Sequence, residues 1–242
     1  MKKLFLTLIL ISFVASGLLA MTVDASLQTF NKQLASVYSD YRMALFQTNK
    51  KSQAKSLKVV NRFHKNWGVL VSKYADQAPE VYHADPSWKA TLQKVSELAA
   101  RGLRETKMGK LHDAHESLEL IRDELAELRQ RNNIVAFSDH VNRYHEQMEV
   151  VVTTKYASGS LAEEQLNVLR EKLALLDYLA ASMKKNAPVQ YNSNPEFKKL
   201  LGNNLVVLES FRSALDRKDA AAIKKAIKQL KPAYAKLFIK FG

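Results

Sequence analysis

The residues best suited to metal chemistry form a cluster of histidine and glutamate near the middle of the chain. They are His112, His115, Glu116 and Glu119, at helical spacing. On a helix His112, Glu116 and Glu119 share a face and His115 lies beside them, so a zinc or copper ion could bridge two of the four. The same residues flank an apolar stripe on its solvent side, where His and Glu are ordinary surface residues. A metal site and a solvated face are therefore alternatives.

A second cluster combines imidazole and thioether groups, which suit copper in an oxidising compartment. It consists of His140, Tyr144, His145 and Met148. His140 and His145 point about 140° apart on a helix, so one ion would need a ligand from another helix. Met148 also fits the apolar stripe of its own helix, which predicts a place in the core.

The last segment of the chain is strongly cationic. Residues 109–130 include three basic and six acidic residues, whereas residues 217–242 include eight basic residues and Asp219 as the one acid. The predicted surface consists of Lys224, Lys225, Lys228, Lys231 and Lys236. Such a surface predicts docking to an acidic protein or to anionic membrane lipid. A solubilising face, or a complement to the acidic helix, is the alternative.

The sequence has no pattern typical of a catalytic site. It lacks a nucleophile elbow, a zinc-protease helix, a phosphate-binding glycine loop and a pair of catalytic carboxylates. Asp123, Glu124 and Glu127 have basic neighbours at helical spacing, as on a solvated face. Because the chain has no cysteine, disulfides, thiolate metal sites and covalently attached haem are excluded. We expect a protein that is not an enzyme.

The first residues have the pattern of an export signal. Two lysines precede an apolar run from Leu4 to Val14, and Val23-Asp24-Ala25 resembles a cleavage site. We predict a signal peptide over 1–25 that is cleaved near Ala25, and a periplasmic mature protein. An uncleaved anchor is the alternative, and no second stretch is apolar enough to span a bilayer.

Removal of the predicted leader leaves a basic protein. Residues 1–25 contain two lysines and one aspartate, so 35 basic and 23 acidic residues remain and the charge is +12. This balance favours acidic partners or anionic lipid. Nucleic acid is not an expected partner of an exported protein.

The sequence also contains an internal repeat with a constant offset of 109 residues. Residues 78–89 match residues 187–198, and four of the five prolines fall into these two segments. In each copy an Asp or Asn precedes a proline, which is the pattern of an N-cap and a first-turn proline where a helix begins. Two positions later comes Trp88 or Phe197, which we predict to enter a core. A repeat of this length indicates two copies of one fold.

Around this repeat the chain resolves into helices, because glycine and proline are scarce and apolar residues recur three or four positions apart. The first copy has predicted helices at 27–48, 52–75, 87–107 and 110–132. The second has predicted helices at 136–157, 160–185, 195–215 and 219–240, with turns at Gly159 and at 216–218. We predict an all-α protein made of two tandem antiparallel four-helix bundles, at 26–132 and 137–242.

Each predicted helix has an apolar stripe for the core of its bundle. In the first copy the stripes include Phe30, Leu34, Val37 and Tyr41; Leu57, Val60, Phe63, Trp67 and Leu70; Leu92, Val95 and Leu98; and Leu111, Ala114, Leu118, Ile121, Leu125 and Leu128. In the second copy they include Val141, Tyr144, Met148 and Val151; Leu166, Leu169, Leu173 and Leu176; Leu201, Leu205, Leu208 and Phe211; and Ile223, Ile227, Leu230 and Leu237.

Three short motifs resemble those of a known family. They are Asn194-Pro195-Glu196-Phe197-Lys198, Gly109-Lys110-Leu111-His112-Asp113-Ala114 and Leu230-Lys231. Together with a short first hairpin and a long proline-containing middle loop, they resemble the soluble cytochrome b-562 family of exported four-helix bundles. The resemblance covers both copies and implies the same bundle topology in each.

In that family a methionine early in the first helix and a histidine late in the last helix bind a non-covalent haem. The histidine position falls on Arg129 in the first copy and on Phe238 in the second. The methionine position falls near Leu34 in the first copy and between Val141 and His145 in the second. The resemblance therefore implies that both copies lack the axial pair, and we expect no cofactor.

These observations predict a non-enzymatic periplasmic binding or interaction protein. The first alternative is a periplasmic electron carrier that binds haem through displaced ligands. The candidates for those ligands are Met43, His140, His145 and Met148. The second alternative is a periplasmic protein that binds copper or zinc, or a chaperone-like stress protein.

Overall fold

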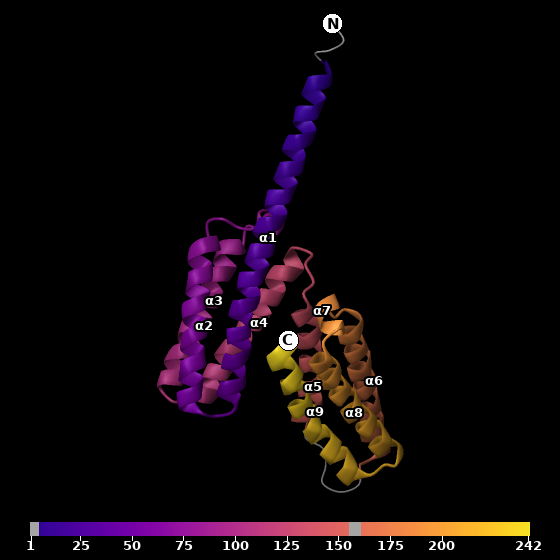
Figure 1. Cartoon of the computed structure of the whole chain (residues 1–242). Helices are drawn as coiled ribbons and strands as arrows, with labels where there is room; N and C mark the ends of the chain where they lie inside the picture. Colours follow the sequence, from indigo (N-terminus) through magenta and orange to yellow (C-terminus); the bar gives the residue numbers. More distant parts are fainter. Residues whose placement is uncertain (1–4, 155–160) are drawn as a thin grey trace. The chain divides into compact units, whose positions relative to one another are not determined.

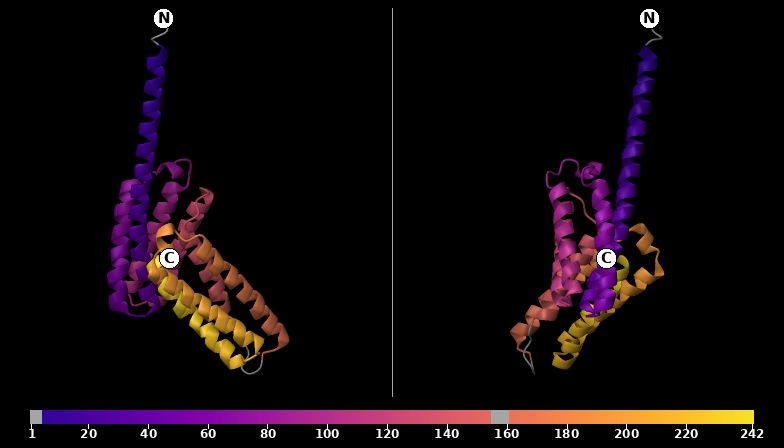
Figure 2. Two further views of the ribbon diagram at one scale, coloured as in Figure 1. Left: turned by 45° about the vertical axis from the view of Figure 1, so that its right-hand side comes forward. Right: turned by 90° about the vertical axis from the view of Figure 1, so that its left-hand side faces the viewer.

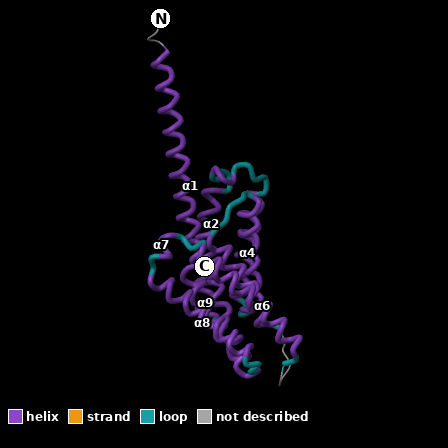
Figure 3. Tube along the Cα trace, turned by 90° about the vertical axis from the view of Figure 1, so that its right-hand side faces the viewer, coloured by secondary structure: helices purple, strands orange, loops and turns teal. Residues whose placement is uncertain are grey.

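The protein is helical throughout the part of the chain that its structure describes. This computed structural model describes the backbone of residues 5–154 and 161–242, with side chains from residue 27 onward. Within those ranges every regular element is a helix and no strand occurs (Figure 3). The all-α prediction is therefore confirmed. The chain divides into two compact units, Met1–Ile134 and Val135–Gly242.

Unit 1 is a bundle of four long helices. Its elements are α1 (Phe5–Asn49), α2 (Gln53–Tyr74), the short η1 (Glu80–Tyr82), α3 (Trp88–Lys107) and α4 (Leu111–Arg131). Each long helix packs on the next, and α1 also packs on α4, which closes the bundle. The N-terminal part of α1 extends beyond the other three helices (Figure 1).

The first helix differs from its prediction at the start. A helix was expected from residue 27, whereas α1 begins at Phe5 and continues without a break to Asn49. Leucine, alanine and methionine, which favour helix, make up nine of residues 5–25 and recur along this stretch. The side chains of 1–26 lie outside the described part, so the leader and its cleavage near Ala25 remain predictions. Among the described residues, no helix combines the length and the apolar character that crossing a bilayer requires.

Unit 2 repeats the arrangement of unit 1. Its elements are α5 (Phe137–Thr153), α6 (Glu163–Lys185), the short α7 (Val189–Asn192), α8 (Pro195–Asp216) and α9 (Ala220–Phe241). The four long helices again pack in sequence, and α5 packs on α9 (Figure 2). Most helix ends lie within one residue of the prediction, but α5 ends four residues earlier and α6 begins three residues later. The predicted turn at Gly159 lies outside the described residues.

The two proline loops have nearly the same backbone conformation. Pro79 has φ −56° and ψ 151° and precedes η1, and Pro188 has φ −53° and ψ 148° and precedes α7. The N–H groups of Tyr82 and Tyr191 donate to the carbonyls of these prolines, each at 2.8 Å. The sequence did not predict the two short helices, because a single helical turn leaves no periodic pattern.

Each proline loop places aromatic rings at the end of its bundle. In unit 1 the ring centroid of Tyr82 lies 4.8 Å from that of Trp88 and 6.0 Å from that of Phe30. In unit 2 the ring of Tyr191 lies 5.6 Å from that of Phe197 and 5.4 Å from that of Phe137. Trp88 and Phe197 are 4% and 1% exposed, which confirms their predicted place in a core.

The cap predicted at these loops forms in unit 2 and is altered in unit 1. The Asn194 side chain accepts hydrogen bonds from the N–H groups of Glu196 and Phe197, and Pro195 is the first residue of α8. In unit 1, α3 begins at Trp88, one residue after the predicted start at 87, and its N-cap residue is Ser87, so the predicted cap with Asp85 as N-cap and Pro86 in the first turn is wrong there. Asp85 accepts instead from the Ser87 N–H at 2.9 Å and from the Asn132 amide at 2.8 Å, which ties the loop to the end of α4.

Most of the predicted core stripes are buried, and one residue in α8 is a clear exception. Leu205 is 39% exposed, and Asn204 takes its place at 1% exposed. Asn204 donates to the carbonyls of Leu200 and Ala233. Asn204 and Leu205 both fit the helical period of the apolar stripe. The Asn204 side chain is tolerated in the core because its N–H groups donate hydrogen bonds. Leu34 and Leu57 are only half-buried.

Candidate interaction surface and polar networks

The exposed face of α9 carries lysine and no acidic residue. The helix begins where Asp219 accepts the N–H of Ala222, and its stripe of Ile223, Leu230 and Leu237 faces the core. This stripe fixes the opposite face toward solvent. The exposed lysines of α9 that have no hydrogen bond or ion pair to the described residues are Lys224, Lys225, Lys228 and Lys236. These four residues are called the α9 lysine face below.

One residue of the predicted cationic surface has a different role. The Lys231 ammonium lies 2.7 Å from the Glu149 carboxylate on α5, and its side chain is 42% exposed. Lys240 similarly contacts Glu196 at 3.4 Å. Lys231 therefore belongs to a polar network within the bundle. Because this ion pair engages its charge, Lys231 is not counted with the four lysines above, and its role in partner binding remains a prediction.

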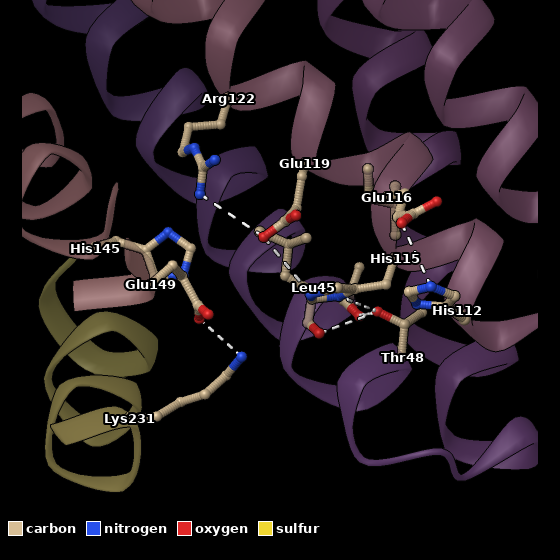
Figure 4. A network of polar contacts seen from close by, with 12 residues as sticks. Leu45, Thr48, His112, His115, Glu116, Glu119, Arg122, His145, Glu149 and Lys231 are labelled. Carbon is tan, nitrogen blue, oxygen red and sulfur yellow. Dashed lines mark hydrogen bonds and ion pairs between the residues drawn. The ribbon is translucent and has the colours of Figure 1, made fainter. Parts of the chain in front are cut away.

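The network around Glu149 links α5 to α9. His145 Nε2 lies 3.2 Å from Glu149 Oε1 (Figure 4). The His145 ring stacks on Tyr234 with centroids 5.0 Å apart. The hydrogen bond from His145 and the charge of Lys231 outweigh partial burial and lower the pKa of Glu149 to about 2. Glu149 is thus a carboxylate at neutral pH that contacts the His145 imidazole and the Lys231 ammonium.

The second predicted cluster is dispersed over different sides of α5. His140 Nδ1 lies 3.1 Å from Ser182 Oγ on α6, whereas His145 lies against α9. Burial and the charge of Arg143 lower the pKa of His140. Tyr144 and Met148 are fully buried in the core, as predicted for Met148. The two imidazoles therefore do not converge on one ion, in agreement with their angular separation.

The first predicted cluster divides into two pairs on α4. His112 Nε2 lies 3.4 Å from Glu116 Oε1 on an exposed surface, and His115 Nε2 lies 3.6 Å from Glu119 Oε1 (Figure 4). The His115 and Glu119 side chains are only 19% and 32% exposed, so the expectation that all four residues lie on the solvent side is wrong. Within the described residues, no group of three or more metal-ligating side chains converges.

His115 is positioned by a threonine on the neighbouring helix. Thr48 Oγ1 donates to the carbonyls of Ala44 and Leu45 and lies 3.0 Å from His115 Nδ1 (Figure 4). This arrangement orients the ring with Nε2 toward Glu119. Zinc or copper binding at this face remains a prediction.

The positions implied by the haem resemblance are occupied by buried residues of other chemistry. Arg129 on α4 and Phe238 on α9 are 6% and 7% exposed. Neither side chain is an iron ligand in haem proteins. Met43 on α1 is half-buried. Haem bound by displaced ligands, and the resemblance itself, remain predictions.

A second cationic surface on α2 was missed by the sequence reasoning. Lys55, Lys58 and Lys65 are exposed, and the whole of α2 lacks an acidic residue. The available signal was the run from Tyr41 to Ala75, which contains eight basic residues and no Asp or Glu.

Comparisons with known proteins identify no relative of this chain. No model of a protein family, no curated protein and no solved structure matches it. The arguments about function therefore rest on the surfaces and contacts described above.

Proposed function

We propose that the protein is a non-enzymatic interaction protein of the periplasm that binds the surface of an anionic membrane through the α9 lysine face. The observation that carries the proposal is this group of four exposed lysines, none of them neutralised by a neighbour in the described part of the chain. A lysine near an anionic bilayer contributes about 1 kcal/mol to binding. Four such residues are sufficient for reversible association.

The composition of the face favours lipid over a folded acidic protein. Protein interfaces are enriched in Arg, Tyr and Trp at their centres and are depleted in Lys. The α9 lysine face lies among Ala221, Pro232 and Ala235, without arginine or aromatic residues on that side of the helix. Lysine is a hydrated point charge that interacts with headgroups without requiring a fixed geometry. This chemistry matches a diffuse layer of phosphates.

The proposed association is peripheral. The large apolar residues of the α9 stripe, such as Leu230 and Leu237, are fully buried, and Ile239 is the one Leu, Ile or Phe of α9 that is partly exposed, so the helix has no continuous apolar face for insertion into the lipid. Binding should therefore be electrostatic and weaken as salt shortens the Debye length. Intact-mass measurement of the protein from its native compartment tests the compartment part of the proposal, because cleavage near Ala25 predicts a chain that begins at Ser26.

The surface itself is tested with vesicles and charge-matched variants. The four-lysine variant is Lys224→Gln, Lys225→Gln, Lys228→Gln and Lys236→Gln. Its control removes the same charge from scattered sites: Lys94→Gln, Lys107→Gln, Lys110→Gln and Lys172→Gln. Sedimentation with phosphatidylglycerol vesicles should show affinity at least tenfold lower for the first variant and nearly unchanged for the second. Far-UV circular dichroism checks that both are folded.

Three results would overturn this proposal. Equal binding to phosphatidylcholine vesicles would exclude a charge-driven contact. Equal losses in the two variants would show that only the net charge matters. Binding of polyglutamate in the absence of any binding to phosphatidylglycerol would favour an acidic protein as the partner.

A further inference from the structure

The α1–α2 hairpin of unit 1 contains a second concentration of positive charge. Between Asp40 and Asp76 the chain has no acidic residue. The basic residues of this run are Arg42, Lys50, Lys51, Lys55, Lys58, Arg62, Lys65 and Lys73. The α3–α4 hairpin of the same unit, residues 88–131, contains nine basic and eight acidic residues. The charge of unit 1 is therefore concentrated on one hairpin.

The helical period brings the basic residues of α2 onto one face. Lys55, Lys58, Arg62 and Lys65 follow at spacings of three, four and three, which places them in one row. The opposite face of α2 is held in the core by Val60, Phe63, Trp67 and Leu70, all at most 3% exposed. Burial of those residues fixes the orientation of the helix. The basic row must then face away from the core.

The members of this row differ in whether they have partners. Arg62 Nε contacts Asp40 Oδ1 on α1 at 2.6 Å, and Lys73 near the end of the helix donates to Gln33 at 3.3 Å. Lys55, Lys58 and Lys65 are exposed and have no ion pair or hydrogen bond within the described residues. These three residues are called the α2 lysine face below. They are the part of the row available to an external anion.

The α2 and α9 lysine faces have the same chemistry. Both lie on helices without acidic residues, and the available charges of both are lysines. A face that only serves solubility usually mixes both signs, as the α3–α4 hairpin does. We infer that the α2 lysine face is a second contact for the anionic lipid surface, so that each unit carries one contact. This inference rests on the proposed function of the α9 lysine face.

Two contacts on one chain have a measurable consequence. Once one face is bound, the other binds from a high local concentration of lipid phosphate, so the affinity of the chain exceeds that of either face. Neutralising a lysine near the bilayer should lower affinity about fivefold. Loss of the three α2 lysines should therefore weaken vesicle binding by tenfold or more while the α9 lysine face is intact.

The test uses the full chain and phosphatidylglycerol vesicles. The α2 variant is Lys55→Gln, Lys58→Gln and Lys65→Gln, and its charge-matched control is Lys94→Gln, Lys107→Gln and Lys110→Gln. Affinity is measured for both, for the α9 variant and for the combined seven-lysine variant. Fluorescence of Trp67 and Trp88, which both belong to unit 1, verifies that unit 1 is folded. We expect the α2 variant to lose at least tenfold, its control less than twofold, and the combined variant all detectable binding.

The possible results separate this inference from the proposed function. If the α2 variant behaves like its control while the α9 variant loses binding, the second contact is refuted and the proposed function stands. If the α9 variant binds like wild type while the α2 variant loses binding, the lipid contact is on α2 and the proposed function of α9 fails. If the combined variant still binds phosphatidylglycerol tightly, both are wrong.

Discussion

The two units share the same frame and differ mainly on their surfaces. The loops at Pro79 and Pro188 agree within a few degrees in φ and ψ, and each brings a tyrosine against an aromatic ring at the start of the next helix. The last helices have diverged in charge, because α4 is rich in Glu and Asp whereas α9 has lysines alone. Packing constrains the buried ends of the bundles, while exposed helix positions are free to change sign.

Cationic charge also lies at different places in the two units. In unit 1 the acid-free helix is α2, and in unit 2 it is α9, although the repeat aligns α4 with α9. Each unit therefore has one lysine face, but not on corresponding helices. The lysine faces are therefore not part of the pattern that the two units repeat.

The largest expected effect comes from the aromatic cores of the loops. Phe197→Ala should destabilise unit 2 by about 3–5 kcal/mol, because it leaves a cavity beside Tyr191 and Phe137. Urea unfolding followed by far-UV circular dichroism detects this loss. Both tryptophans lie in unit 1, so their fluorescence transition should not move.

The corresponding change in unit 1 is expected to affect the stability of unit 1. Trp88→Ala also removes the hydrogen bond from Nε1 to the Tyr74 carbonyl, and should shift the fluorescence transition that Trp67 still reports. If either variant shifted the tryptophan fluorescence transition and the circular dichroism transition equally, the two units would unfold as one. The two units could then not be treated as separate in stability.

The network around Glu149 predicts a pH dependence of the stability of unit 2. Glu149→Gln should cost about 2 kcal/mol at pH 7, because the folded-state pKa near 2 lies below the ordinary value of 4.5. The carboxylate is stabilising above the unfolded-state pKa, and this contribution is lost as pH falls from about 4.5 to 2. The difference from wild type should thus be constant above pH 5 and shrink in acid.

Glu146→Gln on the same helix is the control for this experiment, since it removes the same charge from an exposed position. Thermal unfolding of unit 2 between pH 2 and 7 provides the measurement. A difference that persisted unchanged at pH 2 would show that Glu149 stabilises the bundle by packing alone.

The loop caps predict a smaller difference between the units. Asn194→Ala should destabilise unit 2 by about 1 kcal/mol, because two N–H groups at the start of α8 lose their acceptor. Asp85→Ala should cost unit 1 more than this, because the Asp85 carboxylate also binds Asn132 and Arg131. Equal losses in urea unfolding of the two variants would contradict the difference seen between the two caps.

The smallest effect concerns the turns before α4 and α9. Gly109 and Lys218 occupy matching positions, with φ of 75° and 52°. Because a side chain disfavours this conformation, Lys218→Gly should stabilise unit 2 by about 0.5–1 kcal/mol, and Gly109→Ala should destabilise unit 1 by a similar amount. A Cβ at Gly109 would meet only the Gln53 side chain at 3.6 Å, so crowding does not explain the loss. Thermal unfolding measures both changes.

Much of the fold could be predicted from the sequence, whereas the candidate surfaces could be predicted only in part. Helix positions and most core stripes are local properties of an apolar period, so Phe63, Leu118 and Met148 were predicted correctly. The burial of Asn204 in place of Leu205 was not predicted, because both residues satisfy the apolar period. The contact of Asn204 with the Ala233 carbonyl on α9, which distinguishes them, is not visible in the local sequence. The pairing of Lys231 with Glu149 joins residues 82 positions apart, and no local pattern records it.

By itself the sequence determined the helical class, the repeated proline segments and the density of lysine near the C-terminus. These follow from composition and short-range periodicity, which depend on residues within a turn or two of one another. Only the tertiary structure decided which lysines are available, that the His145 ring stacks on Tyr234, and that Lys231 pairs with Glu149. Those properties depend on which side of each helix the bundle buries, and that choice is made by packing between distant segments.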